Sequence, residues 1–295
     1  MPKTLKFDFY QVDMPQTDPR PFETVIDTIN NLQGADRVYN TDKYPIRLQT
    51  VNRRPAYYIG DIAKIRMNDI PDKMKLSGET EPIDLDDDQG LGEITSFIYN
   101  PDIRLLVLLR NRYAVSATGF AHYYQFKGNI NGELILRPLI ETAALQRLTQ
   151  MGIVKKFELG LAAPGNAQIY QTLGLRPQAV LDLMDVAPKV KVDISFMMDR
   201  ERNSTFSLAA VQRIAGNLIN LNNNNEIVKL SISGKDNPDE STDVLDLLEE
   251  IIVEKEDVNI RNERRITEVD RHHAITTVYQ RREQEMIRML QGDRE

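Results

Sequence analysis

The chain has 295 residues, of which 41% are hydrophobic and 27% charged, a composition typical of a globular protein with one large or two ordinary domains. It contains no cysteine, which excludes disulfides and cysteine-ligated zinc or iron–sulfur sites. The formal net charge of −7 argues against a protein that coats a polyanion, although a local basic patch would still permit nucleic-acid binding.

The first residues, MPKTLKFDFYQV, lack the apolar segment of a signal peptide. The longest uninterrupted apolar run, LLVLL at 105–109, is far too short to span a bilayer as a helix. We therefore expect a cytoplasmic protein, from a prokaryote or its virus.

The N-terminal half of the chain predicts a mixed α/β domain over residues 1–152. Apolar and polar residues alternate in the segments expected to be strands, and apolar residues recur at helical spacing after Pro21. Strands are predicted at Leu5–Val12, Tyr44–Val51, Ala56–Ile59 and Ile62–Met67, with one helix that starts at Phe22 and ends near Gly34. Gly60-Asp61 is interpreted as the break between the last two of these strands.

Residues 97–139 are predicted to be the central unit of this domain, in the order strand, strand, helix, strand. Asn100-Pro101-Asp102 is a turn signal between two apolar strands, and the second of these, Ile103–Leu109, has the composition of a strand buried on both faces. Ser116 can cap the next helix because its hydroxyl can accept from a backbone N–H of the first turn. The remaining elements expected here are a strand at Glu133–Pro138 and a short helix at Glu141–Met151.

After residue 152 the pattern of alternating strands and helices starts again and predicts a second α/β unit. Strands are expected at Lys155–Ala162, Lys189–Met197 and Glu226–Ser233, and helices at Asn166–Leu173, Pro177–Met184 and Phe206–Ile219. The acidic segment Asp243–Glu256 fits a helix and a strand equally well. The sequence thus predicts an α/β or α+β fold, with mixed sheets in two successive α/β units followed by a long C-terminal helix. The corresponding domains are residues 1–152, 153–240 and 241–295.

The C-terminal helix is predicted at Thr267–Leu290 and has one narrow apolar stripe. Its members are Ile275, Val278, Tyr279, Met286 and Leu290. A stripe of this kind needs a surface to pack on, which is either the helix's own domain or a second copy of the chain.

An acidic loop at Glu79–Gly92 is one candidate for chemistry. Its segment from Asp84 to Gly90 superficially resembles a calcium loop, but Gln89 and Thr95 stand where such a loop needs Gly and a bidentate Glu. Neighbouring carboxylates can hold Mg²⁺, as metal-dependent nucleases require. We interpret the loop mainly as a solvated acidic segment.

The sequence contains no histidine pattern and no nucleotide-binding motif that would indicate a cofactor. His272 and His273 are adjacent on the predicted helix and point about 100° apart, so we interpret them, with His122, as structural residues. The sequence has no H-E-x-x-H pattern, no Ser-His-Asp signature, no Walker A motif and no G-x-G-x-x-G after a strand. We therefore expect no cofactor and no resident metal.

Basic residues are the stronger candidates for function, because guanidinium groups bind phosphates in a bidentate manner and loops can bring several together. Taken one at a time, most such charges are simply solvated, so the hypothesis is their convergence on one surface. The candidates for DNA binding are Arg47, Arg53, Arg54, Lys64, Arg66, Arg110, Arg112, Lys155, Lys156, Arg261, Arg264 and Arg265.

The order of several segments resembles the RexA-like family of phage-exclusion proteins. The matching features are Gly90-Leu91-Gly92 after the acidic loop, FIYNPD at 97–102, ELILRPL at 133–139, VKLSISG at 228–234 and a terminal helix with Tyr279. The resemblance implies a dimeric, cytoplasmic protein that binds duplex DNA without strong sequence preference, senses phage infection and acts through a membrane-protein partner encoded nearby.

The sequence thus leads to a non-enzymatic DNA-binding component of a phage-defence or phage-exclusion system that assembles as a homodimer. One alternative is a metal-dependent nuclease that uses Asp84, Asp86, Asp87 or Asp88. Another is an adaptor that binds only protein.

Overall fold

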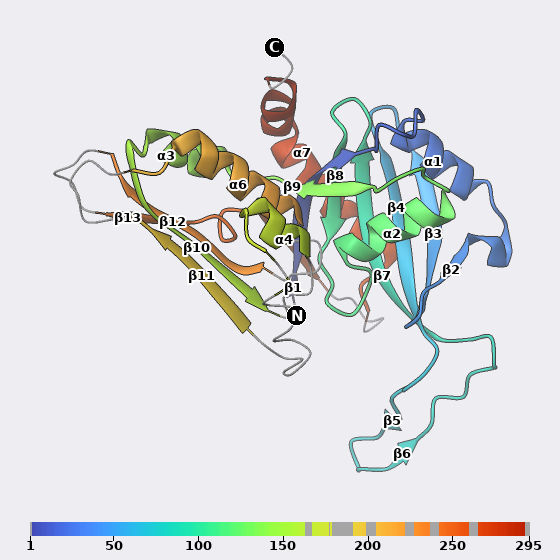
Figure 1. Cartoon of the computed structure of the whole chain (residues 1–295). Coiled ribbons are helices and arrows are strands. Elements are labelled where there is room, and N and C mark those ends of the chain that lie inside the picture. Colours follow the sequence, from blue (N-terminus) through green and yellow to red (C-terminus); the bar gives the residue numbers. More distant parts are fainter. Residues whose placement is uncertain are drawn as a thin grey trace. The chain divides into compact units, whose positions relative to one another are not determined.

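The computed structural model describes residues 2–162, 167–176, 178, 191–198, 205–221, 227–236, 242–259 and 265–292 (Figure 1). The chain divides into two compact units. Unit 1 comprises Met1–Leu136 and Val253–Glu295, and unit 2 comprises Arg137–Ile252. The division expected from the sequence followed the order of the chain, whereas in the structure the segment from Val253 onward returns to the first unit.

Unit 1 is built on an eight-stranded sheet with the order β14-β1-β8-β7-β4-β3-β2, and β9 also pairs with β1. Its strands are β1 (Pro2–Asp13), β2 (Val38–Asn40), β3 (Pro45–Arg53), β4 (Tyr58–Arg66), β7 (Leu91–Asn100), β8 (Leu105–Leu109), β9 (Ile135–Pro138) and β14 (Val253–Asn259). A separate two-stranded hairpin joins β5 (Lys73–Met74) and β6 (Thr80–Glu81). The α+β class is confirmed, but the sheets are antiparallel where mixed sheets were expected.

The hairpin of β7 and β8 forms at the predicted turn, since Asn100 pairs with Leu105 and the Asn100 side chain accepts a hydrogen bond from the backbone N–H of Asp102. β4, by contrast, runs without a break through Gly60. Gly60 is needed for packing, because a Cβ at this position would lie 2.3 Å from the carbonyl oxygen of Thr50 and 2.9 Å from the Phe97 ring.

Helices cover both faces of this sheet. On one face α1 (Phe22–Asn30) and α2 (Ala117–Lys127) pack on aromatic side chains: the Phe22 and Tyr99 rings lie 5.0 Å apart, and those of Phe97 and Phe120 lie 5.2 Å apart. The cap of α2 is confirmed, because the Ser116 hydroxyl accepts from a backbone N–H of the first turn. A short 3₁₀ helix, η1 (Gly34–Arg37), follows α1.

The long helix α7 (Glu268–Gly292) lies on the opposite face. Successive side chains of a strand point to opposite faces, and the Asn100 side chain of β7, next to Tyr99, donates a 2.8 Å hydrogen bond to the Tyr279 hydroxyl of α7. The predicted apolar stripe from Ile275 to Leu290 is buried. The apolar stripe of α7 therefore packs on the helix's own unit, which is one of the two surfaces expected from the sequence.

Unit 2 contains a four-stranded antiparallel sheet with the order β11-β10-β12-β13. Among its described residues the strands are β10 (Ile153–Ala162), β11 (Lys191–Met197), β12 (Ile227–Lys235) and β13 (Asp243–Asp246), and the helices are α3 (Thr142–Gln150), α4 (Ala167–Thr172) and α6 (Leu208–Leu221). One core joins these helices to the sheet.

Two segments in the second half of the chain bear on the elements expected there. The segment Asp243–Glu256 forms two strands, β13 in unit 2 and β14 in unit 1, which explains its ambiguous pattern. The helix expected at Pro177–Met184 lies outside the described residues, apart from Gln178. None of the helices that the structure describes is long and apolar enough to cross a membrane.

Candidate functional site

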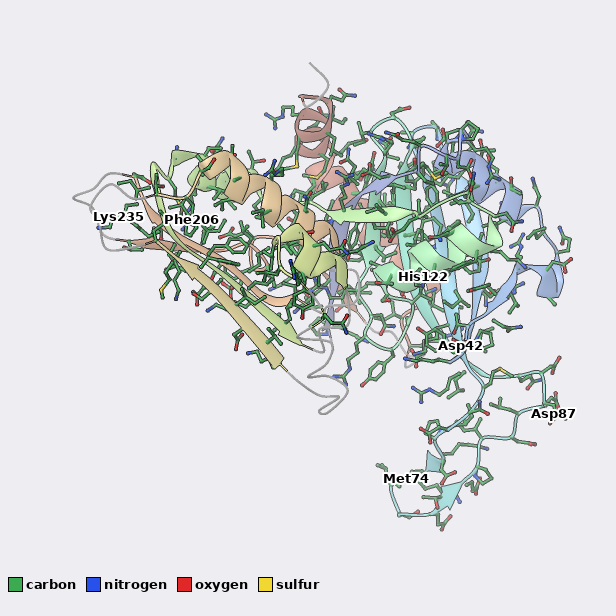
Figure 2. The ribbon with its side chains drawn as sticks, in the orientation of Figure 1. Asp42, Met74, Asp87, His122, Phe206 and Lys235 are labelled. Atoms are coloured by element: carbon green, nitrogen blue, oxygen red, sulfur yellow. The ribbon has the colours of Figure 1, made fainter. Side chains whose placement is uncertain are left out.

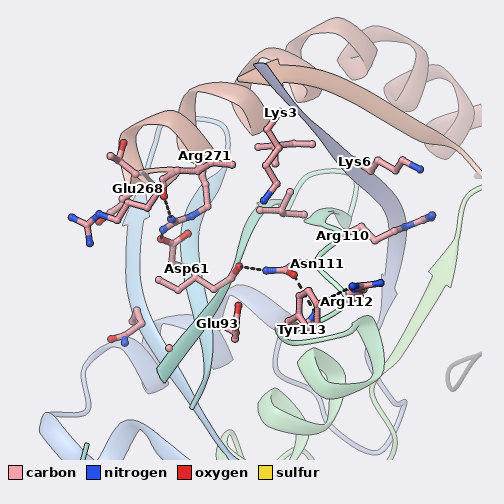
Figure 3. Close-up of a pocket in the computed structure, with 18 of the residues that line it drawn as sticks. Lys3, Lys6, Asp61, Glu93, Arg110, Asn111, Arg112, Tyr113, Glu268 and Arg271 are labelled. Carbon is pink, nitrogen blue, oxygen red and sulfur yellow. Dashed lines mark hydrogen bonds and ion pairs between the residues drawn. The ribbon is translucent and has the colours of Figure 1, made fainter. Parts of the chain in front are cut away.

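Unit 1 contains a pocket of about 890 Å³ where β1, the end of β8 and the start of α7 meet (Figure 3). Six basic and three acidic side chains line it, so the lining has an excess of positive charge although the whole chain is acidic. The basic residues are Lys3, Lys6, Arg110, Arg112, Arg265 and Arg271, and the acidic residues are Asp61, Glu93 and Glu268.

Two exposed lysines belong to this lining. Lys3 and Lys6 lie on β1 and are exposed, and neither makes an ion pair with any residue that the structure describes. Their charges are therefore available to a ligand. The sequence reasoning missed both, because an isolated lysine in an alternating strand is usually only solvated.

The arginines after β8 are held by neighbours. Arg110 makes two hydrogen bonds to the carboxylate of Asp8, one of them 2.9 Å from Nε to Oδ2, and this contact raises the pKa of Arg110. The guanidinium carbon of Arg112 lies 4.5 Å from the centre of the Tyr113 ring, and Arg112 also donates to the Tyr113 hydroxyl. The outer edge of the pocket thus presents a cation and an aromatic side chain together.

At the other end of the pocket, Asp61 is the centre of a buried polar cluster. Its side chain is only 3% exposed, and Nη2 of Arg271 lies 2.5 Å from Oδ2. Oδ1 accepts a 2.5 Å hydrogen bond from the Ser96 hydroxyl and lies 3.2 Å from Nε2 of His272. Burial by itself would raise the pKa of Asp61, but hydrogen bonds from His272 and Ser96 and the charge of Arg271 outweigh it, so the pKa lies below its ordinary value.

The start of α7 positions this cluster. Thr267 and Asp270 cap the helix reciprocally, since the Thr267 hydroxyl accepts from the backbone N–H of Asp270 and the Asp270 carboxylate accepts from that of Thr267. Glu268 and His272 follow four residues apart on the helix. One oxygen of Asp61, one of Glu268 and a ring nitrogen of His272 all lie within 4.8 Å of one another.

Three of the twelve predicted basic residues meet at the pocket, namely Arg110, Arg112 and Arg265. Arg54 lines a second pocket of about 520 Å³ together with Tyr57, His272 and His273. Arg110, Arg112 and Arg265 come together because strands pair and because α7 packs back on the sheet of unit 1. No local sequence pattern encodes these contacts.

The other predicted basic residues lie elsewhere. Arg47 donates to Gln49, the Arg53 guanidinium lies 5.7 Å from the Tyr58 ring centre, and Lys64 lies 4.4 Å from that of Tyr44. Arg66 is at the end of β4. Lys155 and Lys156 belong to unit 2, where Lys156 pairs with Glu158 at 2.9 Å. Arg261 and Arg264 lie outside the described residues.

The acidic loop brings no three of its carboxylates close enough together to share an ion. Asp84, Asp86, Asp87 and Asp88 are exposed, and Figure 2 shows Asp87 on a segment that extends away from the sheet of unit 1. Among the residues that the structure describes, Asp61, Glu268 and His272 are the one group of at least three His, Asp or Glu side chains close enough to share an ion.

A signal for Asp61 was present in the sequence. A single carboxylate inside the apolar strand IGDIAKI must find partners when it is buried. The four-residue spacing of Glu268 and His272 also places them on one face of a helix. Neither pattern identifies the partner on the other element.

Comparisons with known proteins give the family of this chain without giving its activity. The sequence has no match among curated proteins. The model of a family of unknown function, DUF6731, matches residues 1–286, which is nearly the whole chain. The protein therefore belongs to the DUF6731 family.

Proposed function

We propose that this protein binds nucleic acid and that the pocket of unit 1 receives the phosphate groups of a DNA strand. The observation that supports this most is the gathering of six basic side chains from three distant segments of the chain around one pocket. Phosphates are bound by such clusters of lysine and arginine, and the negative charge of the rest of the chain does not oppose a local basic site.

The pocket supplies the two components of single-strand recognition. Lys3 and Lys6 supply exposed positive charge, and Tyr113, which is 46% exposed beside Arg112, supplies an aromatic surface on which a base can stack. Each stacked base contributes about 1–3 kcal/mol in proteins that bind single strands.

The size of the pocket favours a single strand over a duplex. A volume of about 890 Å³ is in the range of pockets that hold a small ligand, so one or two nucleotides can enter while a double helix contacts only the rim. The duplex DNA expected from the sequence is therefore the weaker ligand in this proposal.

The test is fluorescence anisotropy with a labelled 20-nucleotide oligothymidylate and with a duplex of the same length, each over a range of salt concentrations. Wild-type protein binds the single strand more tightly, and affinity falls steeply with salt because counterions are released. The variant K3Q/K6Q lowers the affinity for the single strand about tenfold or more and makes the salt dependence less steep. The matched control is K43Q/K73Q, which removes two exposed lysines outside the pocket and leaves binding unchanged.

No binding at low salt would refute the proposal and would favour the adaptor that binds only protein. Equal losses in K3Q/K6Q and K43Q/K73Q would show general charge attraction in place of a site. A cytoplasmic role in phage exclusion, a homodimeric state and a membrane-protein partner stay predictions from the RexA-like resemblance.

A further inference from the structure

We propose that Asp61, Glu268 and His272 form a binding site for a divalent transition-metal ion such as Zn²⁺. Two carboxylates and one imidazole form a ligand set that suits transition-metal ions better than Mg²⁺ or Ca²⁺, because those two ions prefer oxygen ligands alone. The proposal does not depend on nucleic-acid binding, although Asp61 and Glu268 also line the pocket proposed for the DNA strand. The site differs from the acidic loop considered from the sequence.

The geometry of the three side chains matches metal coordination. Nε2 of His272 and Oδ1 of Asp61 are 3.2 Å apart, which corresponds to an angle of about 100° at an ion about 2.1 Å from each atom. Glu268 lies one turn before His272 on α7, and its oxygen is within 4.8 Å of both other ligand atoms. Glu268 is exposed, so a change of its side-chain rotamer can close the remaining distance.

Neighbouring side chains orient the ligands in the way that supporting residues do in metal sites. Ser96 donates to Oδ1 of Asp61, and Arg271 holds Oδ2 at 2.5 Å. Arg271 also donates to the backbone carbonyl of Ile266, which fixes it on the Oδ2 side and leaves Oδ1 directed to His272. The positive charge of Arg271 lowers the affinity for a cation, but the two carboxylates outnumber it.

The site is accessible, since Glu268 lines the two pockets described above and His272 lines the smaller of them. Three protein ligands leave a coordination position open, as in catalytic metal sites. A different explanation of the same contacts is that Asp61 only anchors α7 to the sheet. That explanation predicts no metal binding.

The experiment titrates tag-free, chelator-treated full-length protein with ZnCl₂, MnCl₂ and MgCl₂ by isothermal calorimetry, with thermal denaturation in parallel. We expect one Zn²⁺ per chain, a higher melting temperature with Zn²⁺, and much weaker binding of Mg²⁺. E268Q and H272Q each lower the Zn²⁺ affinity at least tenfold. H273Q, which changes the adjacent exposed histidine, and E133Q, which changes an exposed glutamate elsewhere in unit 1, do not.

Circular dichroism establishes that each variant is folded, and the exposed position of Glu268 makes E268Q a fair test even if H272Q unfolds. The proposal fails if none of the ions binds, if Mg²⁺ binds as tightly as Zn²⁺, or if H273Q loses as much affinity as H272Q. A loss of DNA binding in K3Q/K6Q with intact Zn²⁺ binding would separate the two proposals.

Discussion

The two units of this protein place charged side chains in opposite environments. The sheet of unit 1 has helices on both faces, and Asp61 lies buried beneath α7 with Arg271 as its partner. In unit 2 the core residues of β10 alternate with Lys156 and Glu158, and Glu158 pairs with Lys156 at 2.9 Å and Lys229 at 3.1 Å while all three stay partly exposed. A charged side chain that is buried in a sheet covered on both sides must have a polar or charged partner. The partners of Asp61 therefore identify the cluster on which the proposed metal site is built.

The largest expected effect is the loss of the buried ion pair in unit 1. D61A leaves Arg271, whose side chain is only 11% exposed, without its carboxylate partner, and we expect a loss of about 3–5 kcal/mol in the free energy of unfolding. The corresponding variant of unit 2, E158Q, should lose less than about 1 kcal/mol because its lysine partners are exposed to water.

Urea denaturation of both variants measures this difference. The double variant D61A/R271M should be more stable than D61A, since it removes the unpaired charge. Equal losses in D61A and E158Q would contradict the contrast between the two units.

Two glycines give a smaller contrast with opposite signs. G60A in unit 1 places a Cβ against Thr50 and Phe97 and should cost about 1–3 kcal/mol. G216A in unit 2 meets no neighbour within 4 Å and lies in the interior of α6, so it should stabilise by about 0.5–1 kcal/mol. Thermal denaturation of the two variants checks the signs, and a neutral G60A would show that β4 has room at this position.

Local structure was largely predictable from the sequence. The alternating strands, the turn at Asn100, the Ser116 cap and the long helix all depend on patterns within a few residues, and all are present. Gly60 was misinterpreted as a break because its true role depends on Thr50 and Phe97, which are distant in sequence.

The candidate site was predictable only in part. Arg110, Arg112 and Arg265 were chosen for their charge, and the structure brings them to one pocket. Lys6 joins them because the backbone N–H of Arg110 donates to the Lys6 carbonyl oxygen, a contact between residues that are 104 positions apart. Asp61 and His272 are even farther apart in the sequence, and no local sequence pattern predicts contacts of this kind.

The most direct test of the proposed binding site is hydrogen–deuterium exchange with and without oligothymidylate, because it measures the exchange of backbone amides in both units in one experiment. We expect protection of the backbone amides near Lys3–Lys6, Arg110–Tyr113 and Arg265–Arg271 in unit 1, with no change along β10 and β12 of unit 2. Protection confined to unit 2, or no protection at an oligonucleotide concentration that saturates binding, would contradict the assignment of the pocket.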